Sequence, residues 1–144
     1  MALTALRHRS VSRTLDGLDI GAIGHFRASI ADLTAGSDIT ARAEFTCPFP
    51  LEVLQAKIIP IAASTGVDGS NTVAVTLSNI TGSATIASLT STADYAANTP
   101  LSMTLTAANV FCAADDVLGI VVTQGATADT AGFYVEVFYR PRAL

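Results

Sequence analysis

The sequence predicts an all-β protein: an eight-stranded antiparallel β-sandwich or jelly roll with an extended N-terminal arm. Short apolar and β-branched runs, divided by Gly, Asp, Asn and Pro, repeat from about residue 20 to residue 140, which is typical of strands joined by turns. Hydrophobic residues make up 50% of the 144 residues and charged residues only 14%. No segment has a sustained helical period. We therefore expect one domain over residues 19–144, preceded by an arm over residues 1–18.

Eight runs have the length and composition of strands. They span residues 20–30, 39–45, 51–63, 72–77, 85–89, 101–106, 117–123 and 133–139. The first run contains glycines and has the weakest pattern. The second alternates between apolar and polar residues. The third is a long apolar run that begins after Pro48 and Pro50, since proline cannot donate to a strand ladder. A turn sequence at 66–71 precedes the fourth run, which alternates again.

The last four runs follow the same rules. The fifth is a short strand after the turn at Gly82, and the sixth alternates after a polar loop. The seventh is apolar throughout, as expected when both faces of a strand are covered. The connections at 90–100 and 107–116 are long for hairpins and allow strands to cross between two sheets. We therefore favour a jelly roll over an up-and-down barrel.

The last run, 133–139, separates two sets of side chains, because successive residues of a strand face opposite sides of the sheet. We expect the core-facing set to be Phe133, Val135, Val137 and Tyr139. The opposite set contains two aromatic residues, Tyr134 and Phe138. Their side chains can form a subunit interface, a sugar-stacking surface or a second covered face within the same domain.

Little in the sequence predicts catalysis. Two histidines, His8 and His25, are too few for the three-histidine metal site of a cupin-like jelly roll, and the sequence has no phosphate-binding, zinc-binding or nucleophile motif. Asp68, with Ser70 and Asn71, offers oxygen ligands for calcium but lacks an acidic closing ligand, so we prefer a turn. We expect no enzyme activity, no cofactor and no bound metal.

Charge and hydropathy exclude several classes of partner. The net charge of −4 gives no overall basic character for binding nucleic acid. No apolar run is long enough to span a membrane, and the first residues lack the apolar core of a secretory signal. We therefore expect neither a membrane partner nor export. Two cysteines, Cys47 and Cys112, are too few for a disulfide scaffold, and their apolar neighbours predict buried thiols.

Arginines gather at the two ends of the chain. Arg7, Arg9 and Arg13 lie in the arm, and Arg140 and Arg142 lie among the last residues. Guanidinium groups bind carboxylates through paired hydrogen bonds, so these residues either contact an acidic partner surface or are solvated tails. The mean hydropathy of +0.48 indicates that some apolar surface is covered by neighbouring proteins.

Three segments resemble a known family. They are 68–77 (DGSNTVAVTL), 105–110 (LTAANV) and 132–141 (GFYVEVFYRP). Their strand and turn patterns are similar to those of small jelly-roll virion proteins of tailed bacteriophages, most of all head decoration (cement) proteins. The chain departs from this pattern at 113–116, where a Gly-Asp turn would be expected before the strand.

The resemblance implies a virion structural protein that decorates and stabilises the expanded capsid. It implies a homotrimer on the outer capsid surface, seated at junctions between subunits of the major capsid protein after synthesis in the host cytoplasm. The five end arginines would then contact the capsid, and Tyr134 and Phe138 would form the trimer interface. A second hypothesis is a receptor- or glycan-binding jelly-roll module of a phage head fibre or tail.

Overall fold

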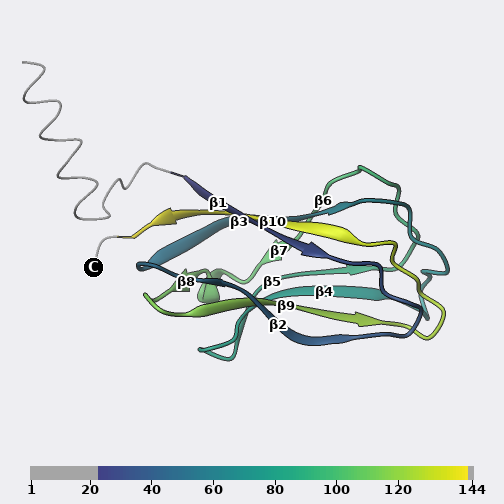
Figure 1. The fold of residues 1–144 in the computed structure, drawn as a ribbon, viewed down its shortest axis with the longest axis horizontal. Helices are drawn as coiled ribbons and strands as arrows, with labels where there is room; N and C mark the ends of the chain where they lie inside the picture. The colour runs from purple at the N-terminus through teal and green to yellow at the C-terminus, as the bar shows by residue number, and fades with distance from the viewer. Residues whose placement is uncertain (1–22, 143–144) are drawn as a thin grey trace, which may run out of the picture.

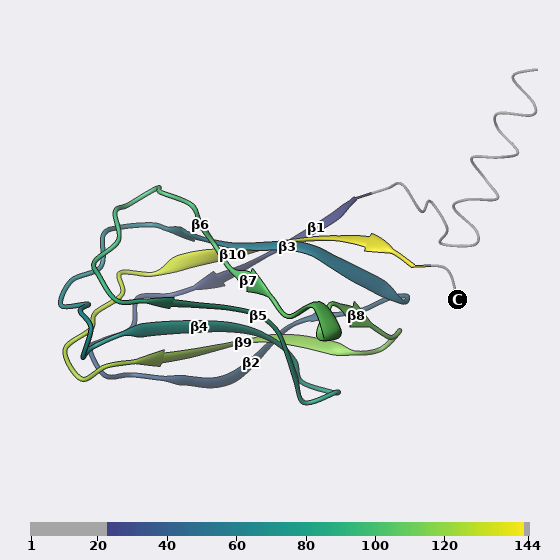
Figure 2. The same ribbon diagram turned by 180° about the vertical axis from the view of Figure 1, so that it is seen from behind.

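A computed structural model describes residues 23–142 of the chain. They form two antiparallel β-sheets that pack face to face, seen from opposite sides in Figures 1 and 2. The expected all-β class is confirmed: this part of the chain has no α-helix and one 3-10 turn, η1 (Ala107–Asn109). The strands are β1 (Gly24–Ile30), β2 (Ile39–Thr46), β3 (Leu51–Pro60), β4 (Val73–Asn79), β5 (Ala84–Ser91), β6 (Leu101–Ser102), β7 (Thr104–Leu105), β8 (Phe111–Cys112), β9 (Val117–Gln124) and β10 (Phe133–Pro141). No helix within the described range has the length and apolar character needed to cross a membrane.

The two sheets, which we name sheet 1 and sheet 2, combine strands from distant parts of the chain. Sheet 1 has the order β1-β10-β3-β6, with β8 also paired to β3, and sheet 2 has the order β2-β9-β4-β5-β7. The last strand therefore lies between the first and the third. Its register with β1 runs from Gly24 opposite Tyr139 to Ile30 opposite Phe133. The start of β1 and the end of β10 consequently lie side by side (Figure 1).

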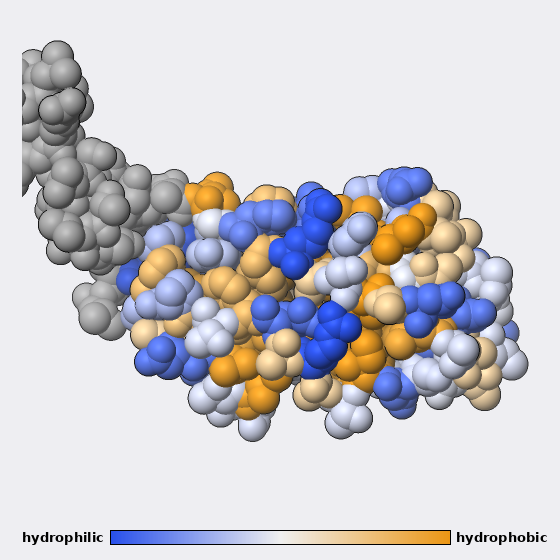
Figure 3. Space-filling view, in the orientation of Figure 1, coloured by the Kyte–Doolittle hydropathy of each residue, from blue (hydrophilic) through white to orange (hydrophobic). Residues whose placement is uncertain are grey.

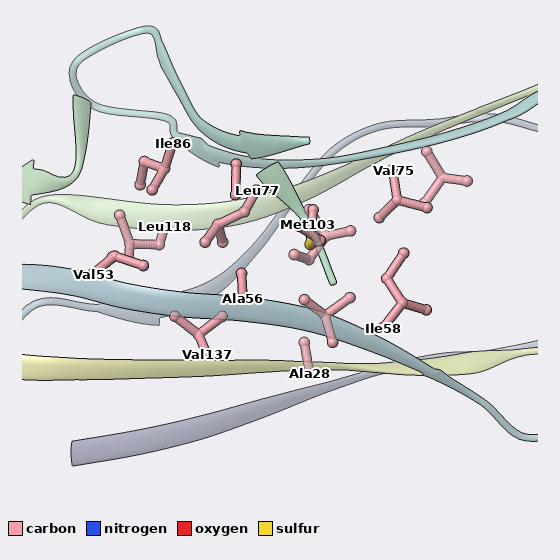
Figure 4. Packing of buried hydrophobic residues seen from close by; sticks show 14 of the residues in the cluster. Ala28, Val53, Ala56, Ile58, Val75, Leu77, Ile86, Met103, Leu118 and Val137 are labelled. Atoms are coloured by element: carbon pink, nitrogen blue, oxygen red, sulfur yellow. The ribbon is translucent and has the colours of Figure 1, made fainter. Parts of the chain in front are cut away.

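An apolar layer fills the space between the sheets. Its largest fully buried side chains come from both sheets: Phe133, Ile30, Leu51, Leu77, Ile86, Leu118, Ile120, Val53, Val75, Val122, Val135 and Val137. Figure 4 shows Val53 and Val137 of sheet 1 opposite Leu77 and Leu118 of sheet 2. Burial of each side chain of this size contributes about 1.5–3 kcal/mol, so this layer holds the two sheets together.

The expected sixth strand is divided between the two sheets. β6 pairs with β3 in sheet 1, and β7 pairs with β5 in sheet 2. Between them, the Met103 amide donates a hydrogen bond to the Ala56 carbonyl oxygen at 2.9 Å, and the Met103 side chain is buried. With the added pair of β8 on β3, the described residues hold ten strands, and the expected count of eight is wrong. An alternating pattern does not show which sheet each half of a run joins.

The other expected runs correspond to the remaining strands, with shifted boundaries. The third run ends at Pro60 instead of residue 63, and the fourth extends to Asn79. The domain boundary that we expected at residue 18 lies outside the described residues.

Side chains of two aspartates tie the connections together at one end of the sheets. Asp94, between β5 and β6, accepts a hydrogen bond from the Val67 amide of the β3–β4 connection at 2.9 Å. Asp38, between β1 and β2, accepts one from the Gln124 amide at the end of β9 at 2.9 Å. Buried amides in loops need such partners, so these carboxylates fix the shape of this end.

Gly66 and Gly69 lie in the same β3–β4 connection but in different surroundings. Gly66 has φ +72°, and a Cβ added there would lie 2.3 Å from the Thr127 carbonyl oxygen. A Cβ added at Gly69 would meet no atom within 4 Å. Only the first position therefore requires glycine.

We expect Gly66→Ala to destabilise the protein by about 2 kcal/mol or more, because the alanine is strained at positive φ and overlaps a backbone oxygen. Gly69→Ala is the matched control and should change stability by less than about 1 kcal/mol. Urea denaturation followed by circular dichroism measures both. Equal denaturation midpoints for the two variants would contradict this assignment.

Candidate interaction surface

The outward side of β10 and its two neighbours forms a surface that we name the β10 face. It consists of three rows across sheet 1: His25, Phe138 and Gln55; Arg27, Glu136 and Lys57; Ser29, Tyr134 and Ile59. The intervening residues of β10 point into the core, as the alternation predicts: Phe133, Val135 and Val137 have no exposed surface. The two-residue period of the strand therefore places Tyr134, Glu136 and Phe138 together on the outside.

Glu136 lies at the centre of the β10 face and is only 8% exposed. The Arg27 Nε atom donates a hydrogen bond to Glu136 Oε1 at 3.1 Å, and Arg27 Nη2 also donates to it. His25 Nε2 lies 3.7 Å from the same oxygen, and Lys57 Nζ lies 4.0 Å from Oε2. The hydrogen bond from Arg27 holds the pKa of Glu136 below its ordinary value, and burial acts in the opposite direction. Three basic side chains thus surround one carboxylate.

The two aromatic side chains of β10 contact the same basic residues. The Arg27 guanidinium carbon lies 4.8 Å from the Tyr134 ring centroid, and Lys57 Nζ lies 5.2 Å from the Phe138 ring centroid. The His25 ring is 4.9 Å from the Phe138 ring, centroid to centroid. A cation over an aromatic ring is stabilising by about 0.5–1 kcal/mol at exposed sites. These contacts hold both rings in defined positions.

The β10 face is open to solvent in the described part of the molecule. The side chains of His25, Arg27 and Lys57 are 41%, 47% and 27% exposed. Such exposure does not fit a second covered face built by residues 23–142, which was one of three interpretations of Tyr134 and Phe138. A subunit interface and a sugar-stacking surface remain.

Arg140 and Arg142 contact partners within the chain. Arg140 Nε donates a hydrogen bond to Glu52 Oε2 at 2.7 Å, and the Arg142 guanidinium carbon lies 3.9 Å from the Phe111 ring centroid. Both arginines lie at the end of sheet 1 where β10 finishes beside the start of β1. The other expected capsid contacts lie outside the described residues: Arg7, Arg9 and Arg13.

Three large apolar side chains within residues 23–142 are exposed: Ile23, Ile61 and Phe111. Figure 3 shows hydrophobic side chains in groups between hydrophilic ones on the side of the molecule in view. The partly buried rings of Phe26 and Phe45 pack against the core and stack on each other at 4.5 Å between centroids.

Asp68 forms a turn, as we preferred over a calcium site. Its Oδ1 atom accepts hydrogen bonds from the amides of Ser70 at 2.7 Å and Asn71 at 2.8 Å. These bonds lower the pKa of Asp68. In the range that the structure covers, no three His, Cys, Asp or Glu side chains gather as a metal site would require.

The sequence pattern did not identify the three basic residues around Glu136. The alternation of His25, Arg27 and Ser29 in β1 is a usable signal that these side chains share one face. It does not reveal that β1 lies beside β10, because that pairing joins the two ends of the chain. The neighbours of Glu136 therefore required the three-dimensional structure.

No protein-family model matches the chain, and no curated protein matches it. Among solved structures, the chain is similar to a protein of Bacillus endospore appendages, which are described as a novel family of disulfide-linked pili. The two chains are 16% identical, with a TM-score of 0.43, over 84% of this chain and 90% of the other.

We expect Glu136→Gln to destabilise the protein by about 1–2 kcal/mol at neutral pH, because the substitution leaves three basic side chains without their carboxylate. The pKa of Glu136 is lower in the folded than in the unfolded protein. Its contribution is therefore present above the unfolded pKa and lost as the pH falls through the folded pKa. The difference between the wild type and the variant should shrink from about pH 4.5 downwards.

Urea denaturation at a series of pH values measures this difference. Glu44→Gln, which removes a carboxylate paired with the exposed Arg42, is the control and should have a smaller effect at neutral pH. A destabilisation by Glu136→Gln that is independent of pH would show that packing, and not the charge, is responsible.

Proposed function

We propose that this protein is a virion structural protein that decorates and stabilises the expanded capsid of a tailed bacteriophage. It would act as a homotrimer, bound to the major capsid protein at junctions between capsid subunits on the outer surface. The observation that carries the proposal is the β10 face. This solvent-exposed surface presents two aromatic side chains and an arginine, Tyr134, Phe138 and Arg27, which are residue types enriched in protein interfaces.

The strand order supports a jelly roll, the fold expected for such a protein. β6 and β8 both pair with β3 and together take the sixth place, while β7 extends sheet 2 beside β5, so β9 and β10 are the seventh and eighth. The antiparallel pairs are then first with eighth (β1 and β10), second with seventh (β2 and β9), third with sixth (β3 and β6) and fourth with fifth (β4 and β5). A ribbon of four such pairs, folded into two sheets, is the jelly-roll arrangement found in viral capsid domains.

The mechanism would be binding alone. A protein that binds the expanded shell and not its precursor stabilises the expanded state by its free energy of binding. A trimer multiplies weak contacts, because the second and third arms bind as tethered ligands. Stabilisation by binding requires no catalytic group.

Two different surfaces would make the trimer contacts and the capsid contacts. Tyr134 and Phe138 on the β10 face would contact the neighbouring subunits of the trimer. The arginines at the chain ends would contact carboxylates of the major capsid protein. The proximity of the start of β1 to the end of β10 supports this division, since it allows both chain ends to meet one partner.

A receptor- or glycan-binding module of a head fibre or tail is the second candidate. The rings of Tyr134 and Phe138 favour it, because aromatic rings stack on sugars. Their contacts with Arg27 and Lys57 count against it, since these cations occupy ring faces that a sugar would need. A glycan array with a saturable signal would select this candidate over decoration.

The double variant Tyr134→Ala, Phe138→Ala should convert the trimer into monomers. Loss of central aromatic contacts typically costs 2 kcal/mol or more, which raises a dissociation constant by roughly 30-fold or more. Analytical ultracentrifugation over a range of concentrations measures the change, and circular dichroism shows whether the variant is folded. The control Thr76→Ala, on the outside of sheet 2, should remain a trimer. A wild-type protein that is monomeric at all concentrations would contradict the proposed assembly.

Replacing Arg7, Arg9 and Arg13 by serine in the full chain should abolish saturable binding to expanded capsids without dissociating the trimer. Loss of charge-assisted hydrogen bonds to carboxylates is the cause. Co-sedimentation with capsids measures binding, and added salt should weaken the wild type much more than the variant. Unchanged affinity of the variant would remove these arginines from the capsid contact.

A further inference from the structure

The two cysteines are neighbours in the folded protein, although they are distant in the sequence. Cys47 follows β2, and Cys112 ends β8. Cys47 has no exposed surface and Cys112 is 4% exposed, which confirms that both thiols are buried. Both belong to the apolar layer between the sheets, and each thiol lies close enough to the other to shift its pKa. The apolar neighbours of the two cysteines in the sequence predicted their burial but not their proximity.

The backbone around both cysteines is fixed by hydrogen bonds. The Cys47 amide donates to the Asp116 carbonyl oxygen at 2.8 Å, and the Asp115 amide donates to the Cys47 carbonyl oxygen at 2.8 Å. Cys112 lies opposite Leu51 in the pair of β8 with β3. A disulfide requires two backbone segments that already lie close together, and these bonds hold the segments of Cys47 and Cys112 side by side.

The loop between β8 and β9 is held by a carboxylate. Asp116 Oδ2 accepts hydrogen bonds from Asn79 Nδ2 at 2.7 Å and from the Ala113 amide at 2.8 Å. This loop contains the residues that bond to the Cys47 backbone. The hydrogen bonds of the folded protein therefore hold Cys112 next to Cys47.

We propose that Cys47 and Cys112 are a disulfide-forming pair, which a small-molecule disulfide such as oxidised glutathione converts into a cross-link between the β2–β3 connection and β8. Each protein thiol gives up its hydrogen, and one S–S bond forms between the two cysteines. The S–S bond of glutathione breaks, and two glutathione thiols carry the hydrogens away. The inference does not depend on the proposed function.

The exchange takes two steps. One of the two thiols, as the thiolate, attacks a sulfur of oxidised glutathione and displaces one glutathione thiol, which leaves a mixed disulfide. The other thiol then attacks the mixed disulfide, forms the bond between Cys47 and Cys112, and releases the second glutathione.

Burial determines when the cross-link forms. Both sulfur atoms lie inside the protein, so the oxidant reaches them only when the part of the sheets around Cys47 and Cys112 opens. Oxidation should be slow in the folded protein and fast while the protein refolds. Once formed, the bond closes a long loop and restricts the unfolded chain, which stabilises the folded state.

The experiment compares full-length protein refolded with oxidised glutathione and with dithiothreitol. After oxidation, we expect the intact mass of a monomer lacking two hydrogens and a tryptic peptide pair joined at Cys47 and Cys112. The melting temperature should rise by on the order of 10 °C. Dithiothreitol should reverse both changes.

Two variants serve as controls, Cys47→Ser and Cys112→Ser. Neither should show an internal cross-link or a melting temperature that depends on the oxidant. The wild type decides the question even if a variant fails to fold. Two free thiols after oxidative refolding, cross-links only between chains, or an oxidised form that melts no higher than the reduced form would each overturn the proposal.

Discussion

The apolar layer between sheet 1 and sheet 2 is the interaction on which the other features of the molecule depend. β10 and β9 lie inside the two sheets, and each contributes a row of inward side chains without exposed surface. Because side chains alternate along a strand, fixing Val135 and Val137 inward also fixes Glu136 outward. A slip of one residue would place Glu136 in the apolar layer, where an unpaired carboxylate is strongly unfavourable. Packing of the core therefore sets the register that assembles the β10 face.

Glu136 contributes to stability and holds the basic side chains of the β10 face in place. The positively charged side chains of Arg27 and Lys57 lie beside Glu136, as the His25 ring does, and the central carboxylate offsets the repulsion between the two cations. The same three side chains contact Tyr134 and Phe138. Side chains that are ordered before association lose less conformational freedom when a partner binds. Under the proposed function, the β10 face would therefore bind a neighbouring subunit with little rearrangement.

Alternation within a single strand was sufficient to place side chains on the correct sides of β4 and β10, because a two-residue period depends only on the strand itself. The period of a single strand does not predict which strands contact each other. Arg27 and Glu136 are 109 residues apart, and their pairing depends on sheet order, which neighbouring residues do not encode. The short strands β6, β7 and β8 have two residues each, and the alternation over residues 101–106 did not show that β6 and β7 join different sheets. For the same reason, apolar neighbours predicted that the cysteines are buried but not that they meet.

The place of β10 in sheet 1 also governs how a newly made chain can fold. Within residues 23–142, β10 is made after the other strands and lies between β1 and β3, so sheet 1 has a gap in its middle until β10 has been made. Until then, β1 and β3 present unpaired edges that invite pairing with other chains. Closure depends on contacts between distant parts of the chain, which form slowly. A nascent polypeptide interrupted before β10 is thus exposed to proteases and aggregation, whereas one that includes β10 can bury both edges at once.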